Sequence, residues 1–119
     1  MELVNALADA YALNHSSVLP AYLQQFHQET LEKHPHAHLQ SSLLQGSFLH
    51  FIVSLLKPQA VLEVGTFSGY SALCMAEAFN TSSAQLHTIE LREADALAAN
   101  QNFSKSIKNK QITLHLGNA

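Results

Sequence analysis

Hydrophobic residues follow two different rhythms along this chain, and the change falls near residue 60. In the first part they recur three or four residues apart, which is the spacing of a helix that buries one face. The first such run contains Leu3, Leu7, Ala10 and Tyr11, and the polar sequence NHSS ends it. The opening of the chain is therefore predicted to be helical.

Two further helices are expected before residue 60. Ser17 can cap one that has Pro20 in its first turn and runs through AYLQQFHQETLEK to HPHAH. The next spans roughly 42–56, and Ser42 and Gln45 have the spacing of a capping box, in which each side chain satisfies an unpaired backbone N–H. The apolar stripe of this helix consists of Leu44, Phe48, Phe51, Ile52 and Leu55.

From Ala60 onward, short apolar runs alternate with helix-like runs. AVLEV, QLHTIE and QITLHL are predicted strands, and SALCMAEAF and READALAANQNF are predicted helices. This alternation is typical of a parallel sheet with right-handed crossovers. The sequence thus predicts an α/β fold in one incomplete domain. Residues 1–57 form an N-terminal helical cap, and residues 58–119 form the first β-α-β-α-β half of a doubly wound, nucleotide-binding sheet.

The sequence ends at GNA, directly after the third predicted strand. In a doubly wound sheet the first strand is normally central and pairs with the fourth on its far side. Without that neighbour, one edge of AVLEV carries unpaired backbone groups, which favours association with another chain. We expect either a homo-oligomer such as a dimer, or a sequence that is a fragment of a longer protein.

Composition narrows the classes of function. Apolar residues make up 47% of the chain and charged residues 13%, as in globular proteins. A formal charge of -3 without a basic cluster argues against nucleic acid as a principal partner. No basic leader precedes an apolar run, and the longest apolar run is far shorter than a membrane span. We therefore expect a soluble, cytoplasmic protein with no membrane partner.

The stretch VLEVGTFSGYS joins the first predicted strand to the helix that follows. It is not a dinucleotide fingerprint, because Glu63 stands where the first glycine is required, and a carboxylate there repels a pyrophosphate. An acid followed by Gly65 and Gly69 suits a ligand that is cationic or offers N–H and O–H donors. S-adenosylmethionine (SAM) has an ammonium, a sulfonium and ribose hydroxyls, and so meets both conditions.

The same stretch and the next strand offer a place for each part of SAM. Gly65 allows close approach to the backbone, and the helix after Gly69 can receive a carboxylate at its N-terminus, with help from the Ser71 hydroxyl. Glu90 ends the second predicted strand, where an acid can bind both hydroxyls of a ribose.

Four segments resemble motifs of the SAM-dependent O-methyltransferases of the caffeoyl-CoA and catechol type. They are LQSSLLQGSFLHFIVSLL, VLEVGTFSGYSALCMAEAF, LHTIELREADALAANQNF and ITLHLGNA, and together they cover most of the chain. The resemblance implies a class I SAM-methyltransferase (Rossmann-like) fold. It also implies methyl transfer to a small hydroxylated, catechol-like acceptor.

The resemblance also implies which residues border SAM. Glu63 and Gly65 match family residues beside the methionine part, Ser71 matches the serine that binds the SAM carboxylate, and Glu90 matches the ribose acid. The remaining implied positions are Ser41, Phe67, Asn118 and Ala119. Ser41 matches a backbone contact, Phe67 a pocket-lining position, and the last two the G-D-A segment beside the adenine.

Two departures from the family pattern are Asn118, which replaces the usual Asp and loses its charge, and Leu39, which replaces a frequent Met. The family's metal-binding acids, its catalytic lysine and most of its acceptor pocket lie on later strands than those present here. We therefore assign no catalytic residue and no metal ligand to this chain. A divalent metal such as Mg²⁺ is expected only in the full-length family member. The alternative function is a non-catalytic SAM-binding or dimerisation module.

Simpler roles stand beside these assignments. Glu63 could cap a neighbouring helix, the two glycines could serve only the turn, and Glu90 could be an exposed strand end. Ser71 could be an ordinary residue of a first helical turn. Cys74, the only cysteine, is expected to be an inert core thiol.

Histidines alternate in HPHAH, at His34, His36 and His38, but a polar loop explains them better than a metal site. His87 and His115 are expected on a face of the sheet.

Overall fold

The N-terminal part of the chain is helical, as its hydrophobic spacing predicts. The computed structural model describes residues 4–119, so Leu3 lies outside the described residues. The elements of this part are α1 (Ala6–Asn14), α2 (Ala21–Lys33), the 3-10 turn η1 (Ala37–Leu39) and α3 (Leu43–Leu56). The predicted capping box starts α3: Gln45 N donates to Ser42 Oγ at 3.1 Å, and Ser42 N donates to Gln45 Oε1 at 2.8 Å.

The second part alternates strands and helices, which confirms the predicted α/β fold. Its elements are β1 (Ala60–Val64), α4 (Tyr70–Glu77), β2 (Gln85–Glu90), α5 (Glu93–Phe103), the 3-10 turn η2 (Asn109–Gln111) and β3 (Ile112–Leu116). The strands form a parallel sheet in the order β1-β2-β3. Its register pairs Glu63 with Thr88 and Thr88 with Leu114. Among the described residues, β1 and β3 are the outer strands of this sheet.

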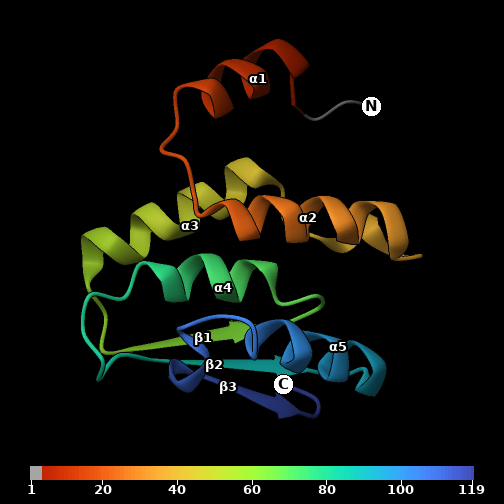
Figure 1. The fold of residues 1–119 in the computed structure, drawn as a ribbon, viewed down its shortest axis with the longest axis vertical. Helices are drawn as coiled ribbons and strands as arrows, with labels where there is room; N and C mark the ends of the chain where they lie inside the picture. Colours follow the sequence, from red (N-terminus) through yellow and green to blue (C-terminus); the bar gives the residue numbers. More distant parts are fainter. Residues whose placement is uncertain (1–3) are drawn as a thin grey trace.

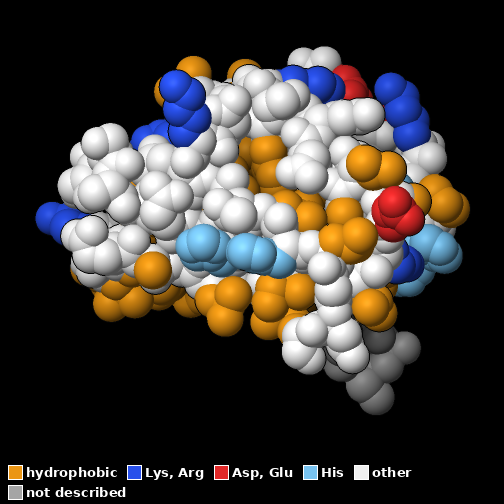
Figure 2. All heavy atoms as spheres, turned by 90° about the horizontal axis from the view of Figure 1, so that it is seen from below, with side chains coloured by type: hydrophobic (Ala, Val, Ile, Leu, Met, Phe, Trp, Pro, Cys, Tyr) orange, Lys and Arg blue, Asp and Glu red, His pale blue; other side chains and the backbone are white. Residues whose placement is uncertain are grey.

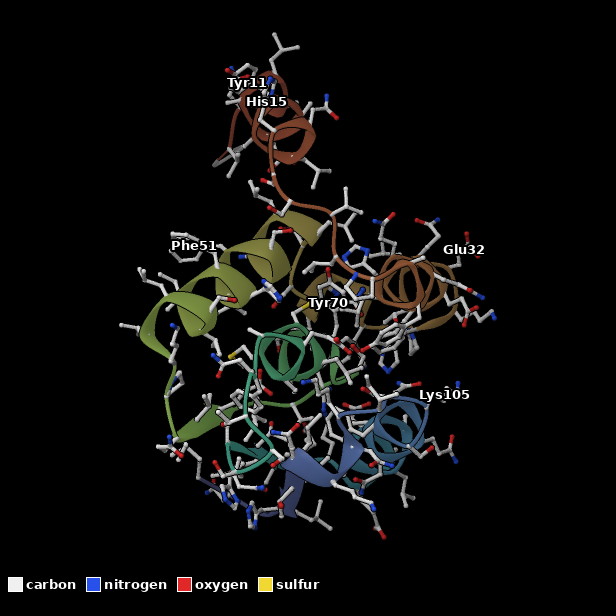
Figure 3. The ribbon with its side chains drawn as sticks, turned by 60° about the vertical axis from the view of Figure 1, so that its left-hand side comes forward. Tyr11, His15, Glu32, Phe51, Tyr70 and Lys105 are labelled. Atoms are coloured by element: carbon white, nitrogen blue, oxygen red, sulfur yellow. The ribbon has the colours of Figure 1, made fainter. Side chains whose placement is uncertain are left out.

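The helices are stacked on one side of the sheet. Figure 1 shows α4 next to the strands, α2 and α3 beyond α4, and α1 farthest from the sheet. The largest fully buried side chains include Leu23 of α2, Tyr70 and Leu73 of α4, and Leu86 of β2. Tyr70 lies between these layers in Figure 3. One hydrophobic core therefore joins the N-terminal helices to the strand–helix part.

The other side of the sheet carries side chains that no described helix covers. Leu62 and Val64 of β1 are each 67% exposed. Beyond them His87 and His115 stack, with Nδ1 of the first 2.9 Å from Nε2 of the second, which confirms their place on a face of the sheet. Figure 2 looks from below and shows hydrophobic side chains around neighbouring histidines.

The start of α2 differs from the prediction. Ser17 does not cap it, since α2 begins at Ala21 with Pro20 in the N-cap position and no side-chain cap. Proline has no N–H to donate and its ring fixes φ, so it suits the residue at which helical hydrogen bonding starts. The carbonyl of Pro20 then accepts from Leu23 N at 3.0 Å.

The apolar stripe of α3 also differs from the prediction, because most of it faces outward. Phe48, Phe51 and Leu55 are 57–63% exposed, and Figure 3 shows Phe51 pointing away from the body. The buried residues of α3 are Gly46 and Val53. A Cβ at Gly46 would lie 2.7 Å from the Tyr70 hydroxyl and 2.8 Å from Cys74 Sγ. The face of α3 that carries its smaller residues therefore packs on α4, and the large side chains of α3 point outward.

One stretch of the described residues, Ala37–Leu56, has the length and mean hydropathy (1.3) of a membrane-span candidate. It joins η1 to α3, and α3 itself has 14 residues. At about 1.5 Å per residue such a helix is roughly 21 Å long, against about 30 Å of hydrocarbon in a bilayer. Only 11% of the candidate window is buried, so this stretch is not a buried core helix, although the face of α3 that contains Gly46 packs on α4.

Candidate functional site

The turn between β1 and α4 has a backbone that only certain residues adopt readily. Gly65 and Gly69 have φ values of 92° and 89°, in the left-handed region that favours glycine. A Cβ at Gly69 would lie 2.6 Å from the Phe103 ring, whereas one at Gly65 would meet nothing within 4 Å. Gly69 is thus needed for packing against α5, and Gly65 borders open space in which a ligand can approach.

Glu63 points from β1 toward the helices and is hydrogen-bonded at both carboxylate oxygens. Oε2 accepts from Ser71 Oγ at 2.5 Å, and Oε1 accepts from Thr88 Oγ1 at 2.7 Å. Thr88 Oγ1 also lies 2.6 Å from Thr66 Oγ1. Burial raises the pKa of Glu63, the two hydroxyl donors lower it in part, and the nearby charge of Glu90 raises it further. Glu63 therefore holds a proton more readily than an ordinary glutamate.

Glu90 is held differently, by backbone N–H groups on both sides. It is 5% exposed. Its Oε2 accepts from Phe67 N at 2.7 Å, and its Oε1 accepts from Arg92 N at 2.9 Å. Burial alone would raise the pKa of Glu90, but these donors and the charge of Arg92 outweigh it and hold the pKa below its usual range. An ionised carboxylate offers about four lone-pair sites, so Glu90 keeps capacity for two further donors.

The structure brings Glu63 and Glu90 to the same face of adjoining strands. Glu63 is in register with Thr88, so Glu90 lies one step farther along the same face of β2. Both carboxylates lie at the carboxyl ends of parallel strands, beside the turn that contains Gly65. Ligands of open α/β sheets bind outside these strand ends.

Ser41 lies immediately before α3, and its carbonyl accepts from His27 Nε2 at 3.0 Å. It also lines an open groove of about 570 Å³ together with residues of α3: Leu44, Gln45, Phe48 and Leu49. The segment that contains Ser41 is tied to the β1–α4 turn by Gln40. The Gln40 side chain donates to His27 O at 3.0 Å and accepts from Ser68 Oγ at 2.8 Å.

Phe67 follows the carboxyl end of β1, and the last residues of the chain follow the carboxyl end of β3. The ring of Phe67 is buried and its backbone has φ 49°. Asn118 and Ala119 are exposed and follow β3. Gly117 N donates to the carbonyl of Glu90 at 2.9 Å, which anchors the terminal segment beside the end of β2.

Sequence reasoning missed two polar residues of this region. Thr88 bridges Glu63 and Thr66, and Gln40 bridges α2 and the turn. The alternation of QLHTIE places Thr88 on the face of Glu90, and that signal could have identified it. Gln40 carries no such signal, because its partners are 13 and 28 residues away.

The histidines of HPHAH do not converge. His34 Nε2 lies 3.2 Å from Asp95 Oδ1, whereas His36 and His38 are exposed. Within residues 4–119, no group of three or more His, Cys, Asp or Glu residues could hold a metal ion. Cys74 is buried, as expected, and burial raises its pKa to about 12, which suits an inert thiol.

Comparison with known proteins shows the family of the chain. A sequence model of the O-methyltransferase family matches residues 13–119. The O-methyltransferase AnkF of Aspergillus thermomutatus is 30% identical over 82% of this chain and 41% of its own length. A catechol O-methyltransferase of Niastella koreensis is 32% identical over 63% of this chain and 34% of its own length. The chain thus spans less than half the length of these curated relatives.

Solved structures give the same result for the fold. The SAH-bound methyltransferase PaMTH1 of Podospora anserina superposes with a TM-score of 0.91 at 30% identity, over 100% of this chain and 53% of that one. An O-methyltransferase of Bacillus cereus in complex with SAH has a TM-score of 0.81 at 25% identity, over 94% of this chain and 50% of that one. Helices followed by a parallel sheet of this order are thus half of a Rossmann-like SAM-methyltransferase fold, and the chain belongs to the O-methyltransferase family.

Proposed function

We propose that this chain forms the methyl-donor site of a SAM-dependent O-methyltransferase. The observation that carries the proposal is the pair of carboxylates, Glu63 and Glu90, on one face of β1 and β2 beside the open backbone of Gly65. The similarity to structures crystallised with SAM or SAH supports the choice of cofactor.

Each end of SAM has a matching group in this proposal. The ionised Glu90 accepts from the ribose hydroxyls with the capacity that its two backbone donors leave free. Glu63 and Gly65 lie beside the methionine part. Ser71 donates to Glu63 in the structure, so its O–H must turn toward the SAM carboxylate when the cofactor binds. Ser41, Phe67, Asn118 and Ala119 complete the proposed site around the methionine part and the adenine.

The reaction is the in-line transfer of a methyl group from the SAM sulfonium to an acceptor hydroxyl. In this proposal the residues of the chain contribute by holding the donor in the right orientation. The described residues do not fit a divalent metal, because residues 4–119 contain no cluster of three candidate ligands. We therefore assign the chain no metal-dependent step.

Membership of the family implies a small-molecule acceptor. We propose that this acceptor is a small hydroxylated, catechol-like molecule. A catechol-like acceptor is supported by the relatives named catechol and caffeoyl-CoA O-methyltransferase. The proposal also includes a cytoplasmic location and a homo-oligomeric state. The exposed edge of β1 supports the second of these.

Replacing Glu90 tests the donor site. Glu90→Ala removes a charged acceptor from the ribose hydroxyls, and hydrogen bonds to charged groups contribute about 1.5–3 kcal/mol. Calorimetric titration with SAM should therefore show a Kd raised by roughly 10- to 100-fold. The matched control is Glu93→Ala, which removes an exposed acid of the first turn of α5 and should leave the Kd unchanged. An unaltered Kd in Glu90→Ala would remove Glu90 from the ribose role.

A second candidate function is a non-catalytic SAM-binding or dimerisation module. The observation that favours it is the unpaired edge of β1, with the exposed side chains of Leu62 and Val64. Such a module associates through this edge and shows no methyl transfer.

A further inference from the structure

The carboxylate of Glu90 depends for its orientation on two neighbouring backbone N–H groups. They belong to Phe67, in the turn after β1, and to Arg92, at the N-cap of α5. If either segment shifts, the carboxylate loses a donor and turns. The side-chain contacts of Phe67 and Arg92 therefore bear on the geometry of Glu90.

Phe67 is held by the end of α2. Its φ of 49° is unusual for a residue with a side chain, so the surroundings must hold it in place. The ring of His34, the residue after α2, meets the Phe67 ring edge to face, with centroids 4.6 Å apart and planes at 78°. This contact joins the N-terminal helices to the turn.

Arg92 is held by Asp95 in the first turn of α5. Arg92 Nε lies 2.8 Å from Asp95 Oδ2, although its N–H is not aligned for a hydrogen bond, so the contact is an ion pair. The other oxygen, Asp95 Oδ1, lies 3.2 Å from His34 Nε2. Asp95 is 8% exposed, whereas the side chains of His34 and Arg92 are 26% and 46% exposed, so the Asp95 end of both contacts is withdrawn from water. His34 thus contacts Phe67 directly and is linked to Arg92 through Asp95.

We propose that His34 and Asp95 are positioning residues for the donor site, because together they hold the two segments that orient the Glu90 carboxylate. The contacts close a ring: Glu90 to Phe67, Phe67 to His34, His34 to Asp95, Asp95 to Arg92, and Arg92 back to Glu90. This inference rests on the proposed SAM site for its functional meaning. The ring of contacts itself is independent of SAM.

A simpler role is local stabilisation of α5, since an acid in a first helical turn interacts favourably with the helix dipole. That role requires only Asp95. It does not explain why the imidazole of a residue 61 positions away in the sequence lies between Asp95 and the turn. The two roles differ in whether the effect of His34 on SAM binding passes through Glu90.

A double-mutant cycle on SAM affinity tests this. We expect His34→Ala to raise the SAM Kd by about fivefold or more, as directly coupled residues do. In a Glu90→Gln background the same change should raise the Kd by less than about twofold. His34→Gln, which keeps an N–H donor for Asp95, should retain part of the affinity. His38→Ala, at an exposed histidine of the same loop, is the control and should have no effect.

Amide hydrogen exchange gives a readout that needs no ligand. His34→Ala should speed exchange of the Phe67 and Arg92 N–H groups and leave that of Gly46 N–H, which donates within α3, unchanged. Equal acceleration at all three amides would indicate general destabilisation and overturn the proposal. An equal effect of His34→Ala on Kd with and without Glu90 would also overturn it. If the wild-type protein does not bind SAM, the proposed function fails, and exchange at Phe67 and Arg92 still decides the positioning role.

Discussion

At the scale of single residues, Glu63 and Glu90 show how identical side chains on neighbouring strands can have pKa values shifted in opposite directions. Both are withdrawn from water, which penalises the charged form. Glu90 accepts from two backbone N–H groups, and these hold its pKa low. Glu63 accepts from two hydroxyls, whose effect is smaller than that of burial, so its pKa stays high.

This difference predicts a pH dependence of stability. Since folding raises the pKa of Glu63, the folded protein binds this proton at a pH where the unfolded chain has lost it. The free energy of unfolding should therefore fall as the pH rises from the ordinary glutamate range to the raised value. Glu63→Gln should flatten this slope in urea unfolding at a series of pH values.

The control for this measurement is Glu93→Gln, at an exposed acid of α5. Glu90 acts in a different window, because its pKa is lowered. Its contribution is present above the ordinary glutamate range and is lost as the pH falls through its lowered pKa. The slope of the unfolding free energy against pH, above the ordinary glutamate pKa range, should differ between Glu63→Gln and the wild type. Equal slopes would contradict the buried, proton-binding state of Glu63.

At the scale of elements, the contact between α3 and α4 depends on the absence of a side chain. A side chain at Gly46 would collide with the Tyr70 hydroxyl and Cys74 Sγ. This contact explains why the large residues of α3 do not face the core. Hydrophobic spacing identifies a stripe, but it does not say which of two faces lies against a neighbour.

Substitution at Gly46 tests this packing. Gly46→Ala gains up to about 1 kcal/mol of helix propensity, but it also forces Tyr70 and Cys74 to move, and overpacking costs about 1–3 kcal/mol. We expect a net loss of stability, seen as a lower Tm in thermal unfolding. Phe48→Ala, on the exposed face of the same helix, should change stability by no more than about 0.5 kcal/mol. A Tm raised by Gly46→Ala would show that α3 and α4 are not in close contact.

At the scale of the whole molecule, the sheet is covered by helices on one face, and β1 has an unpaired edge. Exposed apolar side chains lie beside this edge, on the uncovered face, and others lie on the outer side of α3. An edge strand with apolar side chains is a template for pairing with another chain.

Association through this edge is the prediction at this scale. For residues 1–119 taken by themselves, light scattering or gel filtration should show a size that increases with protein concentration, because two β1 edges can pair. Leu62→Lys places a charge beside the edge and should shift the protein toward the monomer. Ile107→Lys, at a loop residue that is 90% exposed, is the control. If residues 1–119 without substitution stay monomeric at every concentration, association through β1 is refuted.

Local patterns were sufficient for most of the secondary structure. The predicted strands at AVLEV and QLHTIE match β1 and β2, because alternation along a strand is a property of consecutive residues. The capping box of Ser42 and Gln45 is likewise local, since it joins residues three positions apart. The predicted start of α2 was wrong, because Pro20 and not Ser17 occupies the N-cap position.

The sequence by itself determined the alternation of strands and helices, the glycine turn and the two acids, since each follows from residue types and spacing within short segments. Only the tertiary structure decided which face of α3 is buried, that Ser71 donates to Glu63, and that His34 reaches Asp95 and Phe67. The physical reason is that these contacts join elements far apart in the chain. Their geometry depends on how helices and sheet pack together, and no local pattern records that packing.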